Sequence, residues 1–156
     1  MGSKGQENME IREMTIDDYE QVYALWMRIK GFAIRSLDDS YDGIARFLKR
    51  NPATSVVAIE DSKTVGAILC GHDGRRGCLY HVCVDPDYRR RGIGKAMVSY
   101  CLDALRKEEI NNVTLLAFTQ NDIGNSFWHH VGWLEREDIN NYDFNLNEQN
   151  TITYNK

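Results

Sequence analysis

VCVDPDYRRRGIGKAMV, residues 82–98, joins a run of β-branched residues to an amphipathic helix through a turn with three arginines and two glycines. The strand is expected to end at Asp85-Pro86, because proline has no N–H with which to continue strand pairing. Apolar residues recur at helical spacing from Gly92 onward. Gly92 and Gly94 carry no side chains, so several backbone N–H groups can approach one anion at the positive end of the helix dipole. The segment therefore predicts a phosphate-binding turn between a strand and a helix.

A simpler interpretation of this turn stays open, in which the glycines serve turn geometry and the arginines form a solvated tip. The turn does not match two other phosphate-binding motifs. It lacks the G-x-x-x-x-G-K-[ST] pattern of a Walker P-loop, and it is not a G-x-G-x-x-G dinucleotide-binding run after the first strand. In a phosphate site, charge-assisted hydrogen bonds would come from four basic side chains, Arg89, Arg90, Arg91 and Lys95.

Strands and helices are predicted on both sides of this turn. Upstream, the patterns predict a strand, two helices and a three-stranded meander, over residues 9–15, 17–30, 38–50, 54–61, 63–71 and 77–86. Downstream, they predict a helix, a strand, a helix and a closing pair of strands, over residues 92–109, 113–118, 122–131, 133–138 and 141–147. VTLLAF, residues 113–118, is typical of a strand buried on both faces. Residues 77–119 are expected to form a right-handed βαβ unit.

The composition predicts one packed domain. A chain of 156 residues, 42% hydrophobic and 27% charged, has room for a single core. We expect a loose polar leader or cloning remnant at residues 1–8, one domain at residues 9–147 and a polar tail at residues 148–156. The 4 cysteines form no C-x-x-C pair, so they are expected to be reduced core residues, and no metal site is predicted.

Charge and hydropathy limit the expected partners. The net charge of -4 gives no overall positive field, so neither a nucleic acid nor a membrane surface is an expected partner. The apolar runs are far shorter than the roughly 20 residues that cross a bilayer. No signal-peptide pattern opens the chain, which predicts a cytoplasmic protein.

Three sets of residues resemble motifs of the GNAT superfamily of acyl-CoA-dependent N-acyltransferases. The turn matches R-x-x-G-x-G at Arg89, Gly92 and Gly94. The V-x-P-x-[YF] strand end of the family is matched by Val84, Pro86 and Tyr88. The spacing of N-x-x-A-x-x-x-Y-x-x-x-G-F is kept, with three residue types changed, by Asn121, Gly124, Trp128, Gly132 and Trp133. The GHDGRRG hairpin followed by Tyr80 also looks like a bacterial YpeA-like subgroup.

The resemblance implies a mixed α/β fold. Its central, largely antiparallel twisted sheet would have six to seven strands and about four flanking helices, with one βαβ crossover forming the acyl-CoA site. The backbone of Val82, Cys83 and Val84 would pair with the pantetheine arm of acetyl-CoA like an added strand. The pyrophosphate would be bound by Arg89, Arg90, Arg91, Gly92, Ile93, Gly94 and Lys95. Asn121 would bind the arm from the other side, or cap the helix that follows it.

The resemblance also implies direct attack of a neutral amine on the acetyl thioester, with the Val82 N–H donating to the oxyanion. Many members carry a tyrosine as general acid at the position of Trp128, and an indole cannot supply that proton. Trp128 is therefore expected to form a packing or hydrogen-bonding wall near the sulfur. Tyr80 is protonated at neutral pH, so we expect it to orient waters that carry the amine proton away.

Strand alternation predicts which side chains share the acyl face of residues 77–86. One face would carry Cys78, Tyr80, Val82 and Val84. His81 would then point to the opposite face, which favours a packing role for it. His129 and His130, which follow Trp128, are expected to be partly exposed helix residues.

The leading hypothesis is an acetyl-CoA-dependent N-acetyltransferase that acts on a small-molecule or peptide primary amine. The alternative is a catalytically silent acyl-CoA-binding module, because the usual tyrosine is replaced by Trp128. The acidic net charge favours a cationic acceptor, and a homodimer is left open. The resemblance implies an acceptor pocket from six residues for which core or surface packing is the alternative role: Trp26, Arg28, Phe32, Arg35, Tyr41 and Tyr142.

Overall fold

A central sheet of five strands organises the chain. Its strands are β1 (Met9–Glu13), β3 (Val56–Glu60), β4 (Lys63–His72), β5 (Gly77–Val84) and β6 (Val113–Leu115). They lie in the order β1-β3-β4-β5-β6, antiparallel except for the parallel pair β5 and β6. The computed structural model describes residues 9–156, so the leader expected at residues 1–8 lies outside the described residues.

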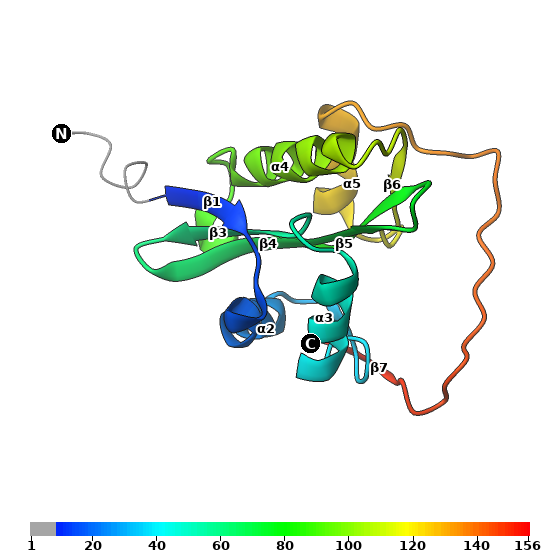
Figure 1. The fold of residues 1–156 in the computed structure, drawn as a ribbon, viewed down its shortest axis with the longest axis horizontal. Coiled ribbons are helices and arrows are strands. Elements are labelled where there is room, and N and C mark those ends of the chain that lie inside the picture. The colour runs from blue at the N-terminus through cyan, green and yellow to red at the C-terminus, as the bar shows by residue number, and fades with distance from the viewer. Residues whose placement is uncertain (1–8) are drawn as a thin grey trace.

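Helices cover both faces of this sheet (Figure 1). One face carries α4 (Ile93–Lys107) and α5 (Asp122–His130), and the other carries α2 (Tyr19–Arg28) and α3 (Tyr41–Arg50). The unit of β5, α4 and β6 is the predicted crossover. The predicted fold class is therefore confirmed: a mixed α/β fold around a largely antiparallel sheet.

Each face of the sheet has its own hydrophobic core. On the α4 side, the buried cluster includes Ile68, Cys70, Met97, Cys101 and Trp128. On the α2 side, it includes Leu25, Trp26, Ile44, Val57 and Ala67. The alternation of β4 residues between the two clusters explains why this central strand is apolar along almost its whole length.

Local signals in the sequence begin and end several elements. The backbone N–H of Thr15 donates to Asp18 Oδ2 at 2.9 Å, where the first helical turn begins. Ser40 Oγ accepts from the Gly43 N–H at 3.0 Å and caps α3. The hairpin between β3 and β4 turns at Asp61 and Ser62, with φ values of 51° and 66°.

The end of the chain differs from the prediction. The pair of strands expected at residues 133–138 and 141–147 is wrong, because residues 134–151 form an extended arm without strand pairing. Its apolar side chains are exposed, Tyr142 by 88% and Phe144 by 86%. Two adjacent strands with no packed face are only marginally stable in water, which explains why an alternating pattern does not suffice here.

The strand at β6 is also shorter than predicted. It pairs with β5 only as far as Leu115, and Leu116 and Phe118 are 76% and 54% exposed. Since β6 lies at the edge of the sheet and leaves β5 after three residues, the expected burial on both faces of residues 113–118 is wrong. The early divergence of β5 and β6 opens the sheet at this point.

Two short strands form a second sheet that the sequence did not predict. β2 (Ala33–Arg35) pairs antiparallel with β7 (Ile152–Tyr154). The Asn155 side chain donates to the carbonyl oxygens of Trp26 and Ile29, at 2.7 and 3.0 Å. The segment 148–156, expected to be a tail, thus carries a strand that ties the chain end to α2.

Candidate active site

A bulge in β5 determines which side chains reach the centre of the site. His81 has a positive φ of 51°, and the register with β4 shifts between Tyr80 and Cys83. Tyr80 packs on Phe47 of α3, and His81 packs on Trp26 of α2. Both side chains therefore face α2 and α3.

The predicted alternation along β5 is wrong at this bulge. Val82 and Val84 pack with the core on the α4 side, and Cys83 belongs to the core on the α2 side. The extra residue shifts the pattern by one position, so Tyr80 no longer shares a face with Val82. His81, expected on the far face, lies beside Tyr80.

The sheet opens between β5 and β6 immediately before the bulge. β5 is paired with β6 only from Gly77 to Leu79. Beyond Leu79, residues 80–84 of β5 have no described strand on that side. Unpaired N–H and C=O groups along a strand edge can accept an extended, amide-bearing chain as an added strand. The edge includes the predicted residues Val82, Cys83 and Val84.

The turn after β5 presents a row of backbone N–H groups. Arg90 and Gly92 have left-handed backbones, with φ values of 65° and 79°. Gly92 caps α4, and its carbonyl accepts the first helical hydrogen bond from Ala96 at 3.0 Å. The N–H groups at the start of a helix have no partner within the helix. Among residues 9–156, no hydrogen bond from the N–H groups of residues 90–95 is found, so the turn has the geometry of an anion site.

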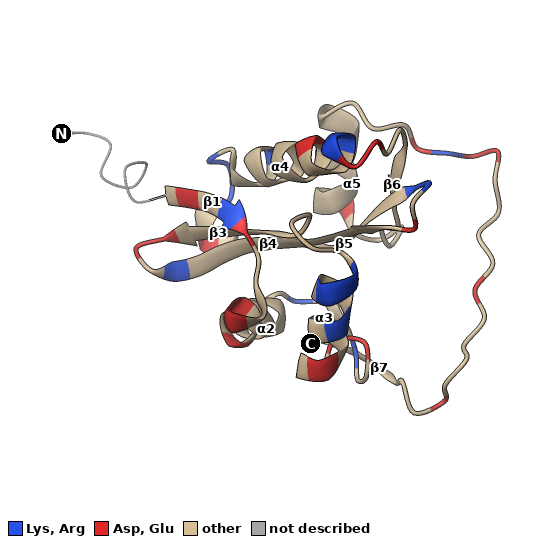
Figure 2. Ribbon diagram, in the orientation of Figure 1, with Lys and Arg blue, Asp and Glu red and all other residues tan. Residues whose placement is uncertain are grey.

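The arginines of the turn differ in how free their side chains are. Arg91 Nη1 lies 3.2 Å from the buried Glu60 carboxylate, and its guanidinium lies over the Tyr88 ring. Arg89 Nε donates to the Val84 carbonyl at 3.3 Å. Because the Arg91 guanidinium is already bound, anion contacts from Arg91 would come from its backbone N–H. Figure 2 shows basic positions at the turn that enters α4, with charges of both signs along the rest of the chain.

A surface pocket of about 440 Å³ lies beside this turn. Its lining consists of Glu60, Asp61, Lys63, Asp87, Tyr88 and Arg91. The carboxylates in the lining make it unsuited to a diphosphate.

Asp85 anchors the start of the turn. Its buried carboxylate accepts from Arg28 Nη2 at 3.0 Å and from the Asp87 N–H at 3.0 Å, and Lys63 Nζ lies 3.5 Å away. Burial raises the pKa of Asp85, but the Asp87 N–H, Arg28 and Lys63 outweigh burial and hold the pKa below its usual value. The turn is thereby tied to α2 and β4.

Asp85→Asn is expected to lower the free energy of unfolding at pH 7 by about 1–3 kcal/mol, because the ionised carboxylate loses its partners. A carboxyl with a lowered folded pKa stabilises above its unfolded pKa of about 3.9, and this stability is lost as pH falls through the folded value. The difference between wild type and variant should therefore shrink below pH 4. Urea unfolding at pH 7 and pH 3 measures it. Asp87→Asn is the exposed control, and an equal loss in both variants would contradict the anchor.

Tyr80 and Cys78 are both poor bases in the folded chain. Burial, followed by hydrogen bonding with Cys78, raises the pKa of Tyr80. Burial likewise raises the pKa of Cys78. Both groups stay protonated at neutral pH, which agrees with the expectation that Tyr80 does not take the amine proton itself. Tyr80 is 50% exposed and can contact water or an acceptor.

Trp128 lies on α5, and Asn121 is the residue that caps the start of this helix. Trp128 is 8% exposed and packs against the rings of Phe127 and Trp133, with centroids 4.9 and 4.8 Å away. These contacts favour the packing role expected for Trp128. Asn121 Oδ1 accepts from the Gly124 N–H at 3.0 Å, so the predicted helix cap is confirmed. A role for either residue toward acetyl-CoA stays a prediction.

The six residues expected around the acceptor are not gathered into one site. Trp26 and Phe32 pack on His81, and Tyr41 packs edge-on against Tyr19 of α2. Arg28 is bound to Asp85. The remaining two lie on different segments, Arg35 on β2 and Tyr142 on the exposed arm.

The structure adds one residue that sequence reasoning missed. Asp39 Oδ1 lies 2.8 Å from His81 Nε2, and the Asp39 side chain is 5% exposed. Asp39 lies 42 positions before His81 in the sequence. No local pattern connects residues so far apart. The one local signal is the pair of adjacent polar aromatic residues, Tyr80 and His81, which does not fit strict alternation along β5.

Within residues 9–156, no helix is both long and apolar enough to span a bilayer. The same residues hold no cluster of three or more histidine, cysteine, aspartate or glutamate side chains arranged for a metal ion. All four cysteines are free thiols, and three of them are buried: Cys70, Cys83 and Cys101.

Comparisons with known proteins agree with this arrangement. A model described as the acetyltransferase (GNAT) family matches residues 11–133. The acetyltransferase SG1711 of Sodalis glossinidius is 37% identical over 114 residues, which cover 73% of this chain and 79% of that protein. The acetyltransferase ECA0875 of Pectobacterium atrosepticum is 35% identical over the same shares of the two chains.

Solved structures share the fold at lower sequence identity. The PaiA N-acetyltransferase of Thermoplasma acidophilum, in complex with coenzyme A, has a TM-score of 0.68 at 20% identity, covering 80% of this chain and 88% of that one. AAC(6')-Iy, in complex with the bisubstrate analogue CoA-S-monomethyl-acetylneamine, has a TM-score of 0.70 at 18% identity, covering 88% and 98%. At these identities, the similarities concern the fold.

Proposed function

Because the chain belongs to the acetyltransferase (GNAT) family, we propose that it transfers the acetyl group of acetyl-CoA to a primary amine by direct attack on the thioester. It is an acetyltransferase, and acetyl-CoA is the cosubstrate of its family. No covalent enzyme intermediate is formed in the proposed reaction. The YpeA-like subgroup stays a prediction.

The opening between β5 and β6 is the observation that carries this proposal. The free edge of residues 80–84 fits the amide groups of the pantetheine arm, and the N–H groups of residues 90–95 fit a pyrophosphate. The distance along the chain between the two features is short, as a single extended ligand requires. Asn121, at the start of α5, is the proposed contact on the second side of the arm.

The chemistry follows from the groups along this edge. The thioester carbonyl would lie near the backbone N–H of Val82, which stabilises the oxyanion as the amine adds. The nitrogen–carbon bond forms and the carbon–sulfur bond then breaks, leaving the electron pair on sulfur. Trp128 forms a wall near the sulfur in this proposal. A thiol that ionises near pH 8.5 can leave without a dedicated general acid.

The acceptor is proposed to be a small-molecule or peptide amine. The net charge of -4 favours a cationic molecule. The acetylneamine moiety bound by AAC(6')-Iy supports the inclusion of aminoglycosides among the candidates. A polyamine and a peptide with a free amino terminus complete the set.

Release of free thiol from acetyl-CoA tests the proposed function. Spermidine, neamine and a peptide with a free amino terminus are each incubated with the protein, and the thiol is followed with a chromogenic disulfide. We expect release that depends on both protein and amine. Acetyl-CoA binding by calorimetry without release for any amine would favour the silent acyl-CoA-binding module instead, for which the tryptophan at position 128 is the argument.

A further inference from the structure

His81, which is partly exposed, and the buried Asp39 form a pair on the α2 side of the sheet. His81 Nε2 lies 2.8 Å from Asp39 Oδ1, and the side chains are 21% and 5% exposed. The imidazole packs against both Trp26 and Phe32, each with a ring centroid 4.8 Å away. A carboxylate that holds one ring nitrogen of histidine fixes the tautomer and leaves the other nitrogen free to accept a proton.

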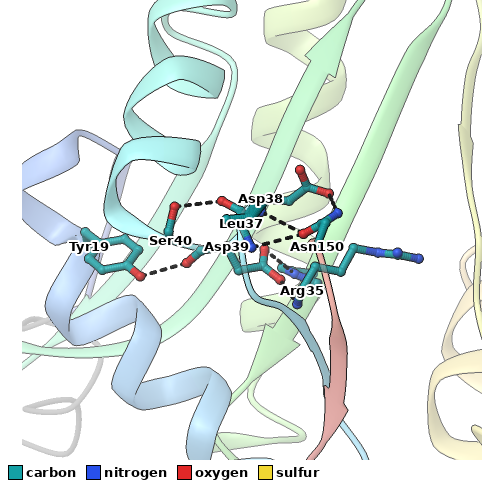
Figure 3. A network of polar contacts seen from close by, with 8 residues as sticks. Tyr19, Arg35, Leu37, Asp38, Asp39, Ser40 and Asn150 are labelled. Carbon is teal, nitrogen blue, oxygen red and sulfur yellow. Dashed lines mark hydrogen bonds and ion pairs between the residues drawn. The ribbon is translucent and has the colours of Figure 1, made fainter. Parts of the chain in front are cut away.

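The Asp39 carboxylate is itself held in place. The Arg35 N–H donates to Asp39 Oδ2 at 2.7 Å, so the two carboxylate oxygens have separate partners. Tyr19 Oη of α2 donates to the Asp39 carbonyl at 2.7 Å (Figure 3). The orientation of the carboxylate toward His81 is therefore determined by α2 and by the end of β2.

The carboxyl-terminal segment closes this loop from the other side. Asn150 Oδ1 accepts from the N–H groups of Leu37 and Asp38, at 3.0 and 3.2 Å, and its amide group donates to Asp38 Oδ2 at 2.9 Å. Figure 3 shows these bonds converging on the loop that carries Asp39. These bonds tie the loop before Asp39 to the carboxyl-terminal segment.

The position of His81 along β5 gives the pair a chemical role. His81 lies two residues beyond the last residue paired with β6 and directly precedes Val82, the proposed oxyanion donor. On the opposite face, Val82 and Val84 pack into the α4 core. An amine that attacks a carbonyl near Val82 therefore approaches from the face that carries His81.

We propose that His81, oriented by Asp39, is the general base that accepts the proton of the acceptor's ammonium group. The inference rests on the proposed acetyl transfer. The ammonium proton moves to His81 Nδ1, and the neutral amine forms the new bond to the acetyl carbon. As the carbon–sulfur bond breaks, the thiolate takes the second amine proton, and His81 releases the first to solvent through its exposed edge.

The other groups around the imidazole do not compete for this proton. α2 contributes the uncharged Trp26, and Arg28 of the same helix is bound to Asp85. On β5 itself, burial raises the pKa of Tyr80, and burial raises the pKa of Cys83 to about 12. Neither Tyr80 nor Cys83 therefore offers a site for this proton at neutral pH.

The test measures kcat/KM for acetyl transfer to spermidine, neamine and the peptide between pH 6 and pH 10, with His81→Gln as the main variant. We expect a loss of about 10²- to 10⁴-fold at pH 7, the range of general base catalysis. The loss should shrink at high pH, where the amine is already neutral. With hydroxylamine, which is neutral at pH 7, the loss of kcat/KM in His81→Gln should be far smaller than with the ammonium acceptors.

Asp39→Asn tests the positioning residue. It should lower kcat about tenfold or more with unchanged KM for acetyl-CoA, and displace the acid limb of the pH profile to lower pH. Asp38→Asn is the matched control, because its amide can still pair with Asn150, and it should keep the wild-type profile. Calorimetry with acetyl-CoA should give the same affinity for all four proteins, which separates catalysis from folding.

Two results would overturn the base. One is His81→Gln with the wild-type rate and pH profile, and the other is an equal loss with hydroxylamine and the ammonium acceptors. In both cases, acetyl transfer by the wild-type protein would still support the proposed function. A wild-type protein that acetylates no amine would overturn the proposed function, and the base with it.

Discussion

Replacing both glycines of the turn, as in Gly92→Val with Gly94→Phe, is expected to weaken acetyl-CoA binding about 100-fold or more, a loss of roughly 2.7 kcal/mol. Valine at position 92 has to adopt a left-handed backbone, with φ of 79°. A Cβ on Gly94 would already lie 3.4 Å from the Phe127 ring and 3.7 Å from Val84, so a phenylalanine has to displace these side chains or the first turn of α4, which carries the N–H groups. Isothermal titration with acetyl-CoA measures the effect.

Two matched variants distinguish loss of the proposed pyrophosphate site from a general effect of backbone strain. Gly74→Val carries a comparable left-handed strain, with φ of 90°, in a hairpin outside the turn, and should leave the affinity unchanged. Gly94→Ala makes only ordinary contacts with Phe127 and Val84 and should cost little. Full affinity in the double variant would remove the proposed pyrophosphate site.

Trp26→Ala is expected to reduce the free energy of unfolding by about 3–5 kcal/mol, the range for a fully buried aromatic residue. Trp26 is 0% exposed and stacks on Phe32, with centroids 6.1 Å apart. Its loss leaves a cavity between α2 and the sheet, under His81. Urea unfolding followed by circular dichroism measures the change, and Met27→Ala, at a 48% exposed position on the same helix, is the control.

Trp26→Phe sharpens the same test. Among residues 9–156, Trp26 Nε1 is the buried side-chain polar atom without a hydrogen-bond partner. Phenylalanine removes this unsatisfied donor while keeping most of the packing, so it should cost far less than alanine. Equal destabilisation by Trp26→Phe and Trp26→Ala would show that the indole ring does more than fill the core.

Elements with local signals could be predicted from the sequence, and elements defined by distant partners could not. α4 was predicted over 92–109 and spans Ile93–Lys107, because its apolar spacing and its glycine start lie within the segment itself. The strands β2 and β7 have three residues each and stabilise one another across most of the chain. No window of sequence contains both, so their pairing has no local signature.

The candidate site divides in the same way. The turn at residues 89–95 follows from glycines and a helix start, which are adjacent in sequence. The face of His81 depends on a bulge, and a bulge depends on the register between β4 and β5, so alternation alone gives the wrong side. Asp39 joins the site through the packing of α2, β2 and the chain end, which only the folded structure reveals.

The last strand of the chain lies against the segment that presents Asp39. A change in the pairing of β7 with β2 would therefore change the orientation of the Asp39 carboxylate, and with it the rate of proton transfer to His81, without altering any residue of β5. The same dependence gives the protein a structural reason to keep its final residues folded back on α2.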